Sequence, residues 1–468
     1  MEELSLNSDV IYYGIIPTVL IPLTLVSFVL SMIASFIAGL FGIKLSTEGP
    51  RKLVELVLKP RFIAMAVVIN LGVFGVVKAY EFVDRIPTSF LRIKLMNNES
   101  PSEIEYKDAS VSDFKFKRNL NASFSDYKVQ KEVKFDSGAF YSPVVSGDSL
   151  FMGSDAGDFM ELDKKTLERK RVLHLKTFLS SGTSIHDGFA YFGEGEHKTY
   201  MARIFKIDLK NFSVKDYFKT KGHTEGTGAR LGESLIFPAG DDGIYRIDLH
   251  TMKKMWHAKI GHVDSEVSYD GINAYVGTAL DSKRGGEYAN AFALDLKTGE
   301  IIWKKNLIAS SWFRPLVLDE KVCFVVGEIY FESQIGGIEC FNKANGDLVG
   351  SLRLSAPVTS MMILVDSNIV FANNSGEICS VDSVTLQKNW CTKTGDDKYS
   401  YSSVNYDGNK DALVLASRKH GFFAIDPDDG KVLQQVKFGE KEKFYARPLV
   451  DEQNLYVVSL DGMVRILN

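Results

Sequence analysis

The side chains of this sequence that could do chemistry are acidic turns and histidines. Asp241-Asp242-Gly243 and Asp428-Asp429-Gly430 begin like calcium-binding loops. Neither continues into the spacing of oxygen ligands that calcium requires, so both are interpreted as turns. His257 and His262 could meet across a turn, although scattered surface histidines explain them equally well. We therefore predict no metal site.

Catalytic motifs are also absent from the sequence. It contains no G-x-S-x-G, H-E-x-x-H or phosphate-loop pattern. A net charge of −4 with interspersed signs argues against a nucleic-acid surface. We expect a protein that is not an enzyme, has no catalytic residues and uses no cofactor.

Two arginines and their neighbours are the candidates for protein contacts. Arg314 and Arg447 each directly precede a proline that opens a strand. If these strands line a central channel, both guanidinium groups can reach its mouth and bind carboxylates or an extended peptide. Ion pairs between neighbouring repeats are the alternative. Trp312 and Phe313 add aromatic surface typical of interface hot spots, and loop 280–288 is longer than its equivalents. The candidate contact residues are Trp312, Phe313, Arg314, Arg447, Arg284 and Tyr288.

Four cysteines lie late in the chain, in no metal-ligand spacing. Cys323 and Cys340 would lie on neighbouring strands of one repeat, as would Cys379 and Cys391. Cross-strand disulfides could form in an oxidising compartment. We favour the alternative, in which all four are small buried apolar residues.

The elements that must position these residues are copies of one module, found from about residue 140 to the C-terminus. Each copy is an apolar strand that ends in aspartate, a tight turn and a second strand. The spacing averages about 43 residues, which suits a four-stranded propeller blade. The copies place the following residues at this position: Asp163, Asp208, Asp248, Asp295, Asn342, Asp382, Asp426 and Leu467. We interpret these repeat aspartates as structural, accepting hydrogen bonds from turn amides.

Two further positions of the module are informative. Four residues after the repeat aspartate, the turn carries either glycine (Gly299, Gly346, Gly430) or an apolar residue (Leu167, Phe212, Met252, Leu386). Glycine adopts a left-handed turn at little cost, whereas the apolar residues are expected to fold inward. Trp256, Trp303 and Trp390 all stand eight residues after the aspartate and are expected to pack between blades.

Closure of the ring can be predicted from the ends of the repeat region. The chain ends at Asn468, so the last copy lacks its outer strand. Residues 127–135 place Tyr127, Val129, Val133 and Phe135 on one face with period two. This segment can supply the missing strand and remove two sheet edges. The expected fold class is therefore all-β, an eight-bladed β-propeller over residues 127–468.

The segment Ala293-Leu-Asp-Leu-Lys-Thr-Gly-Glu-Ile-Ile-Trp303 resembles the tryptophan-docking repeat of quinoprotein-type (PQQ-like) propellers. That family contains dehydrogenases, which use pyrroloquinoline quinone with calcium, and cofactor-free scaffolds. The size of this domain is similar to the cofactor-free branch around the outer-membrane assembly factor BamB. The resemblance implies an eight-bladed ring that presents loops to other proteins. The chain departs from the dehydrogenases in having no adjacent cysteine pair, and from BamB in having no lipobox cysteine.

Residues 1–80 are predicted to be a membrane anchor. Val10 to Ile43 contains no charged residue, and a first membrane segment is expected at about 17–43. Pro17 and Pro22 break the run, which leaves about 23–43 as its regular helix and an interfacial stretch before it. A second helix is expected at about 61–80. Basic residues between the two place that loop in the cytoplasm and both chain ends outside. A helical hairpin buried in a soluble protein is the alternative. Residues 81–126 are interpreted as an extracytoplasmic linker.

Together these features predict a scaffold for protein–protein interaction in a cell-envelope complex. It would be anchored in the inner (cytoplasmic) membrane, with its N-terminus and propeller on the periplasmic side. Its partners would be the membrane and other envelope proteins. The alternatives are a membrane dehydrogenase that uses pyrroloquinoline quinone and calcium, and a receptor domain that senses a ligand.

Overall fold

The computed structural model describes residues 106, 109–110, 114–179, 181–195, 199–280, 289–329, 334–395, 403–439, 442–452 and 454–468. This part of the chain contains no helix, and so none that could cross a membrane. The two predicted helices at 17–43 and 61–80 lie outside the described residues, as do Arg284 and Tyr288.

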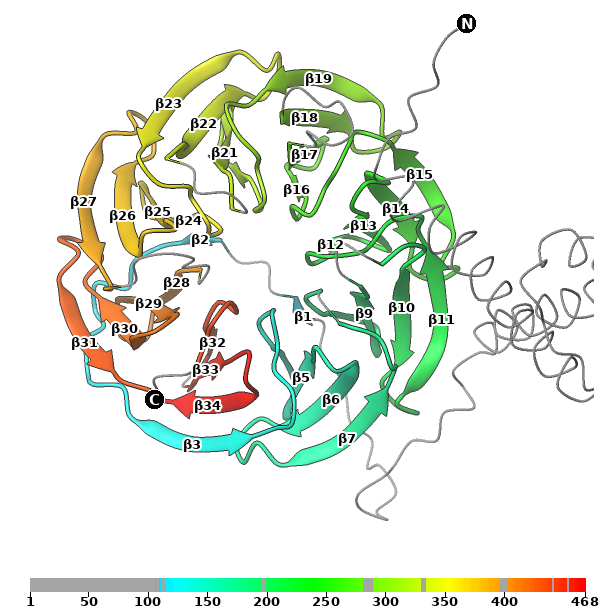
Figure 1. Cartoon of the computed structure of the whole chain (residues 1–468), viewed down its shortest axis with the longest axis horizontal. Helices are drawn as coiled ribbons and strands as arrows, with labels where there is room; N and C mark the ends of the chain where they lie inside the picture. The colour runs from blue at the N-terminus through cyan, green and yellow to red at the C-terminus, as the bar shows by residue number, and fades with distance from the viewer. Residues whose placement is uncertain are drawn as a thin grey trace, which may run out of the picture. The chain divides into compact units, whose positions relative to one another are not determined.

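The described strands form eight antiparallel blades around a ring, which confirms the predicted eight-bladed propeller (Figure 1). We number the blades from the one that contains β4. In blades one to seven, the strands follow chain order from the inner strand beside the channel to the outer strand at the rim.

Blade one consists of β4 (Val144–Ser146), β5 (Ser149–Gly153), β6 (Asp158–Asp163) and β7 (Arg169–His174). Blade two consists of β8 (Ser184–His186), β9 (Phe189–Gly193), β10 (Arg203–Asp208) and β11 (Ser213–Lys219). Blade three consists of β12 (Ala229–Leu231), β13 (Ser234–Pro238), β14 (Ile244–Asp248) and β15 (Lys254–Ala258). Blade four consists of β16 (Ser268–Tyr269), β17 (Asn273–Gly277), β18 (Asn290–Asp295) and β19 (Ile301–Asn306).

Blade five consists of β20 (Leu316–Val317), β21 (Lys321–Gly327), β22 (Gly336–Asn342) and β23 (Leu348–Leu354). Blade six consists of β24 (Ile363–Val365), β25 (Asn368–Ala372), β26 (Glu377–Asp382) and β27 (Lys388–Lys393). Blade seven consists of β28 (Asn405–Asp407), β29 (Ala412–Ser417), β30 (Gly421–Ile425) and β31 (Val432–Val436). Blade eight consists of β32 (Leu449–Asp451), β33 (Asn454–Val458), β34 (Met463–Leu467) and the N-terminal β3 (Val129–Lys134).

The hydrophobic core lies between adjacent blades. The two middle strands of each blade are covered on both faces and therefore read as continuous apolar runs, such as β13 and β29. Outer strands alternate between packed and exposed side chains, as β23 does. One cluster joins Met152 and Met160 of blade one to Tyr456 of blade eight, so the core continues across the point of closure.

The predicted closing strand is confirmed, with one correction to its register. β3 pairs antiparallel with β34 and lies outside it in the ring (Figure 1). Tyr127 and Phe135 are buried, as expected. Val129 is 40% exposed, because a bulge between Val129 and Lys131 shifts the alternation by one residue.

The end of the predicted linker is part of the propeller. β1 (Ala109–Ser110) adds to the inner strand of blade two, and β2 (Lys115–Phe116) adds in parallel to the inner strand of blade six. β1 and β2 therefore lie against inner strands on opposite sides of the ring (Figure 1). The interpretation of this part as a linker misses these pairings, because the partner strands lie far along the chain and local periodicity does not report them.

All four cysteines form disulfides, which corrects the interpretation that they are simple buried apolar residues. Cys323 pairs with Cys340 across β21 and β22, and Cys379 pairs with Cys391 across β26 and β27. In both cases the two residues stand directly opposite each other in the ladder. This register brings the Cβ atoms close enough for a bond.

Candidate functional site

The propeller has two faces that differ in the kind of connection they carry. The loop face carries the connections from second to third strand and from each outer strand to the next inner strand, such as 239–243 and 259–267. The turn face carries the hairpins between the first two strands and between the last two strands of each blade. The predicted contact residues Trp312, Phe313 and Arg314 lie in a loop-face connection, between β19 and β20.

The repeat aspartates accept hydrogen bonds from backbone amides of the turns that follow them, as predicted. Asp295 Oδ1 accepts hydrogen bonds from the amides of Lys297 and Thr298 at 3.0 and 2.7 Å. The backbone bond from Thr298 is the main reason that the pKa of Asp295 is lowered. The same bonding recurs at Asp163, Asp208, Asp248, Asn342, Asp382 and Asp426.

The three tryptophans pack between blades, also as predicted. Trp303 Nε1 donates to the Lys343 carbonyl of the next blade at 2.9 Å, and its ring lies against Gly346. Trp256 and Trp390 repeat this arrangement, donating to the carbonyls of Leu296 and Pro427. Each of these indoles therefore links its blade to the next.

Arg314 and Arg447 both reach the channel, where they meet the chain's own N-terminal segment. Their guanidinium carbons lie 4.2 and 4.5 Å from the centre of the Phe114 ring, within cation–π range. Glu266, 5% exposed, is the nearby acid: burial raises its pKa, while Arg314 and Arg447 act to lower it. Phe114 therefore occupies the position at which a ligand for these arginines was expected.

Beside Phe114 a cavity of about 530 Å³ remains in the channel. Lys115, Tyr269, Asp270 and Lys343 contribute to its wall. Lys343 and Asp270 form an ion pair at 3.4 Å, which compensates charge at this wall. A small ligand entering here would contact the N-terminal segment as well as the blades.

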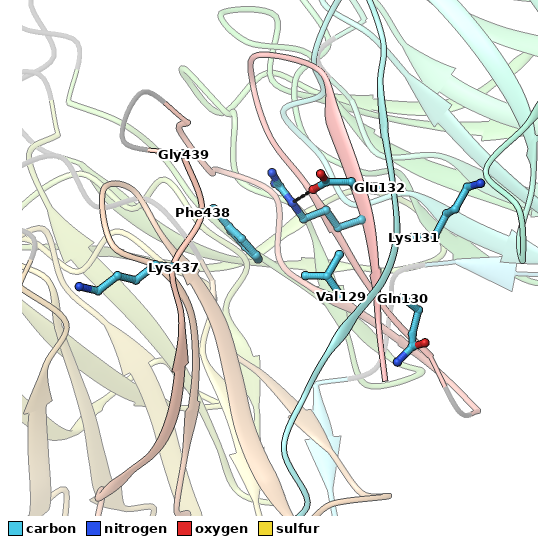
Figure 2. Close-up of a pocket in the computed structure, with 8 residues that line it drawn as sticks. Val129, Gln130, Lys131, Glu132, Lys437, Phe438 and Gly439 are labelled. Carbon is cyan, nitrogen blue, oxygen red and sulfur yellow. Dashed lines mark hydrogen bonds and ion pairs between the residues drawn. The ribbon is translucent and has the colours of Figure 1, made fainter.

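A second concave surface lies at the rim, where blade eight closes (Figure 2). This groove of about 490 Å³ lies between β3 and the residues that follow β31. Glu132, labelled in Figure 2, accepts a hydrogen bond of 3.0 Å from Arg465 Nε. Arg465 also binds Glu442 and lies over the Phe438 ring. The groove is thus built around an arginine that attaches the closing strand.

The most concentrated group of titratable side chains lies on the loop face of blades two to four. His223 Nε2 and His262 Nε2 contact the two carboxylate oxygens of Asp264 at 2.8 and 2.9 Å. His262 Nδ1 also contacts Asp241 Oδ1 at 2.6 Å. We call these four residues the histidine cluster. His223 is 2% exposed and Asp264 9% exposed, so the cluster is largely buried.

Charge complementarity determines the protonation of this cluster. Burial acts to lower the pKa of His262, but hydrogen bonds to Asp241 and Asp264 outweigh it and raise the pKa to about 10. Burial acts to raise the pKa of Asp264, yet the two imidazoles bring it below its ordinary value. His262 is therefore an imidazolium between two carboxylates at neutral pH.

Sequence reasoning found only part of this cluster. His262 was noted with His257 as a pair, but His257 instead stacks on the Tyr245 ring with 3.9 Å between centroids. The true neighbour of His262 is His223, which was missed. The spacing of the two histidines could have revealed the pair. His223 stands four residues after the end of β11, and His262 stands four residues after the end of β15, so they occupy equivalent positions in consecutive loops. Asp241 and Asp242 form a turn rather than a calcium loop, with Asp242 accepting from the Lys221 amide.

Exposed apolar side chains on the loop face were also missed. Among the described residues, five large apolar side chains are exposed in loop-face connections of blades two to five: Tyr200, Met201, Leu280, Ile308 and Ile335. Of the residues expected to form the contact surface, Trp312 and Phe313 are only half-buried, and Phe313 packs on the core. Partner contact through any of these side chains stays a prediction.

The fold defines the class of protein: an eight-bladed β-propeller. The family model of the outer membrane protein assembly factor BamB matches residues 293–468. The outer membrane protein assembly factor BamB of Legionella pneumophila (strain Paris) is 23% identical over 180 residues, 38% of this chain. The matching segment spans 45% of that relative's length. The predicted resemblance to PQQ-like repeats of the BamB type is therefore confirmed.

Solved structures share the fold. BamB from Moraxella catarrhalis has a TM-score of 0.57 and 14% identity, over 73% of this chain and 100% of its own. The quinohemoprotein alcohol dehydrogenase from Comamonas testosteroni has a TM-score of 0.58 and 12% identity, over 73% and 76%. The computationally designed Ika8 protein has a TM-score of 0.57 and 10% identity, over 71% and 96%. A fold common to a BamB, a dehydrogenase and a design does not assign a function.

Proposed function

We propose that this chain is a membrane-anchored, extracytoplasmic propeller that acts as a non-catalytic scaffold for protein–protein interaction in a cell-envelope complex. The observation that carries the proposal is the set of exposed apolar side chains in loop-face connections. Tyr200, Met201, Leu280, Ile308 and Ile335 occupy connections of blades two to five. Apolar groups held on a rigid ring are suited to binding another protein.

The described ends of the N-terminal segment contact the turn face rather than the loop face. Tyr106 donates to the Leu209 carbonyl, and Arg118 contacts Asp411 and Asp428, all in turn-face hairpins. Tyr106 and Arg118 thus lie at the turn face, away from the loop-face connections that carry the exposed apolar side chains.

Two observations support the extracytoplasmic location. Both cysteine pairs are disulfides, and such bonds persist mainly in oxidising compartments. The similarity to an outer membrane protein assembly factor also favours the envelope. The anchor at residues 1–80 remains part of the proposal.

The alternative function is a dehydrogenase that uses pyrroloquinoline quinone with calcium, favoured by the fold shared with the quinohemoprotein enzyme. The purified full chain is titrated with pyrroloquinoline quinone, with and without Ca²⁺, while cofactor absorbance is followed. We expect no saturable binding. Calcium-dependent uptake at one equivalent would replace the scaffold proposal by the enzyme.

Site-specific crosslinking in intact membranes tests the scaffold. A photoreactive phenylalanine is placed at Ile308 or Ile335 on the loop face, and at Val384, 76% exposed on the turn face, as the matched control. We expect crosslinks to the same partner from both loop-face positions and none from Val384. Recovery of the chain alone from every position would contradict the proposal.

Aspartate substitutions give an independent readout. Ile308→Asp with Ile335→Asp places charges in a contact that excludes water and should lower partner co-purification roughly 10-fold or more. Val384→Asp should leave it unchanged. Equal losses from both variants would show that the loop face is not the specific contact.

A further inference from the structure

The histidine cluster has the donor set of a metal site. Two imidazole nitrogens and a carboxylate face one another, and one ligand atom from each of His223, His262 and Asp264 lies within 4.8 Å of the others. We propose that these three residues bind a divalent transition-metal ion of the zinc type on the loop face. This inference does not depend on the proposed scaffold function.

The present distances are close to those of a bound site. Zinc binds imidazole nitrogen and carboxylate oxygen at about 2.0–2.2 Å in a tetrahedron, so neighbouring donors stand roughly 3.3 Å apart. Here the two Nε2 atoms lie 2.8 and 2.9 Å from the Asp264 oxygens. These two nitrogen–oxygen distances are within about half an ångström of the donor spacing in such a shell, and one ligand atom from each of the three residues lies within 4.8 Å of the others.

Asp241 is placed to orient one ligand. Its Oδ1 lies 2.6 Å from His262 Nδ1, the ring nitrogen that does not face Asp264. A carboxylate on the second nitrogen is the usual support of a metal-binding histidine, because it fixes the ring and directs Nε2 toward the ion. Asp241 and His262 already have this arrangement.

The backbone holds the three loops in register. Gly240 and Val263 exchange two backbone hydrogen bonds of 3.0 Å, which join the β13–β14 loop to the β15–β16 loop. The His223 ring packs directly on Gly240, where an added Cβ would lie 2.6 Å from Nδ1. Gly240 also has a φ of 53°, so a side chain here would be both strained and obstructed. The sequence thus keeps this space for the imidazole.

The donor types select the metal. Imidazole with carboxylate suits zinc and its transition-metal neighbours, whereas calcium takes six to eight oxygens. The ion takes the place of the Nε2 hydrogens, and the displaced protons pass to solvent, because Nδ1 of the His262 imidazolium already carries the hydrogen that faces Asp241. The three protein ligands leave a coordination position for water or a partner's side chain.

Calorimetric titration of the full chain with Zn²⁺, in detergent after treatment with a chelator, tests the site. We expect one ion per chain and no comparable binding of Ca²⁺. Asp241→Asn should weaken the affinity about 10- to 100-fold, as loss of an orienting partner does. His223→Asn and His262→Asn should weaken it further. The control is His174→Asn, which alters an exposed histidine on β7 and should change nothing.

A spectroscopic measurement on the unmodified chain removes the dependence on variants that fail to fold. Co²⁺ should give the visible absorption bands of a tetrahedral nitrogen and oxygen site, and Zn²⁺ should remove them. The absence of saturable binding, an octahedral Co²⁺ spectrum, equal affinity for Ca²⁺, or unchanged Zn²⁺ affinity in well-folded His223→Asn and His262→Asn would each overturn the proposal.

Discussion

At the scale of single residues, a large side chain on the outer strand of one blade packs against a small turn residue of the next blade. Trp256 and Trp303 each lie on the turn glycine of the next blade, Gly299 or Gly346, where an added Cβ would come within 2.7 Å of the indole. Glycine is required at both turns because a Cβ would collide with the indole and because the backbone φ is positive, which other residues rarely adopt. A large outer-strand side chain is thus paired with a turn that has none.

The opposite pairing fills the same space between blades five and six. Gly350 stands at the tryptophan position of blade five, and the turn of blade six carries Leu386, 4% exposed at a φ of 58°. A Cβ at Gly350 would lie 3.1 Å from Leu386 Cδ1. The strained backbone at Leu386 is offset by burial of its side chain, as the sequence predicted for the apolar turn residues.

A double-mutant cycle at this joint tests the matching. Gly350→Trp should lower the free energy of unfolding by about 1–3 kcal/mol or more through overpacking, and Leu386→Gly by about 2–5 kcal/mol through a cavity. The double variant, Gly350→Trp with Leu386→Gly, recreates the tryptophan–glycine pair. Its loss of unfolding free energy should therefore be smaller than the sum of the losses in the two single variants. Thermal unfolding of the four proteins measures the coupling; strict additivity would show that the two positions do not share one space.

At the scale of elements, the N-terminal segment joins blades that are distant in the ring. β1 extends blade two, β2 extends blade six, and Arg118 then binds Asp411 and Asp428 of blade seven. Asn119 continues the contact, since its amide donates to Tyr406 at 2.8 Å. The segment therefore acts as an additional cross-link of the ring rather than a simple tether.

The contact of Arg118 with Asp411 should depend on pH. The hydrogen bond from Arg118 is the largest cause of the lowered pKa of Asp411. A carboxyl with a depressed native pKa stabilises the fold above its unfolded pKa of about 3.9, and the contribution is lost as pH falls through the native pKa. Arg118→Ala should speed amide exchange at residues 118–127 roughly 10-fold at pH 7.

The difference between Arg118→Ala and the unmodified chain should then shrink toward zero in strong acid, where Asp411 is protonated in both. Lys117→Ala is the matched control, because Lys117 is exposed on the same segment. Exchange that is equally fast in both variants at pH 7 would show that the ion pair does not hold the segment.

At the scale of the whole molecule, closure of the ring by β3 resists separation of the blades, whereas the disulfides act within blades five and six. β3 forms the outer strand of a blade whose other strands come from the C-terminus, so separation of the blades requires this sheet to break. Tyr127 strengthens the joint through its hydroxyl, which donates to Asp407 at 2.6 Å in a buried position.

The disulfides of blades five and six add to this stability. They close short stretches of chain, with sequence separations of 17 and 12 residues. Replacing either pair by alanine should lower the free energy of unfolding by about 2–4 kcal/mol. Melting temperatures are compared with and without reductant. Reductant should destabilise the unmodified chain but have little effect when both pairs are replaced; equal sensitivity would mean that the bonds are not formed.

The sequence by itself determined the blades. The repeat aspartate, the turn residue four positions later and the closing strand follow from local spacing, because each blade makes its turns from consecutive residues. Asp295, Leu386 and Tyr127 could each be assigned a role in this way. The number of blades followed from counting copies and noticing that the last lacked a strand.

Only the tertiary structure decided what lies in the channel and on the loop face. Phe114 meets Arg314 and Arg447 across the centre of the ring, and His223 meets His262 from an adjacent loop. Such contacts join loops and strands that are not hydrogen-bonded neighbours, and no periodicity along the chain records them. The exposure of Val129 belongs here too, since a single bulge reverses the alternation that the sequence predicts.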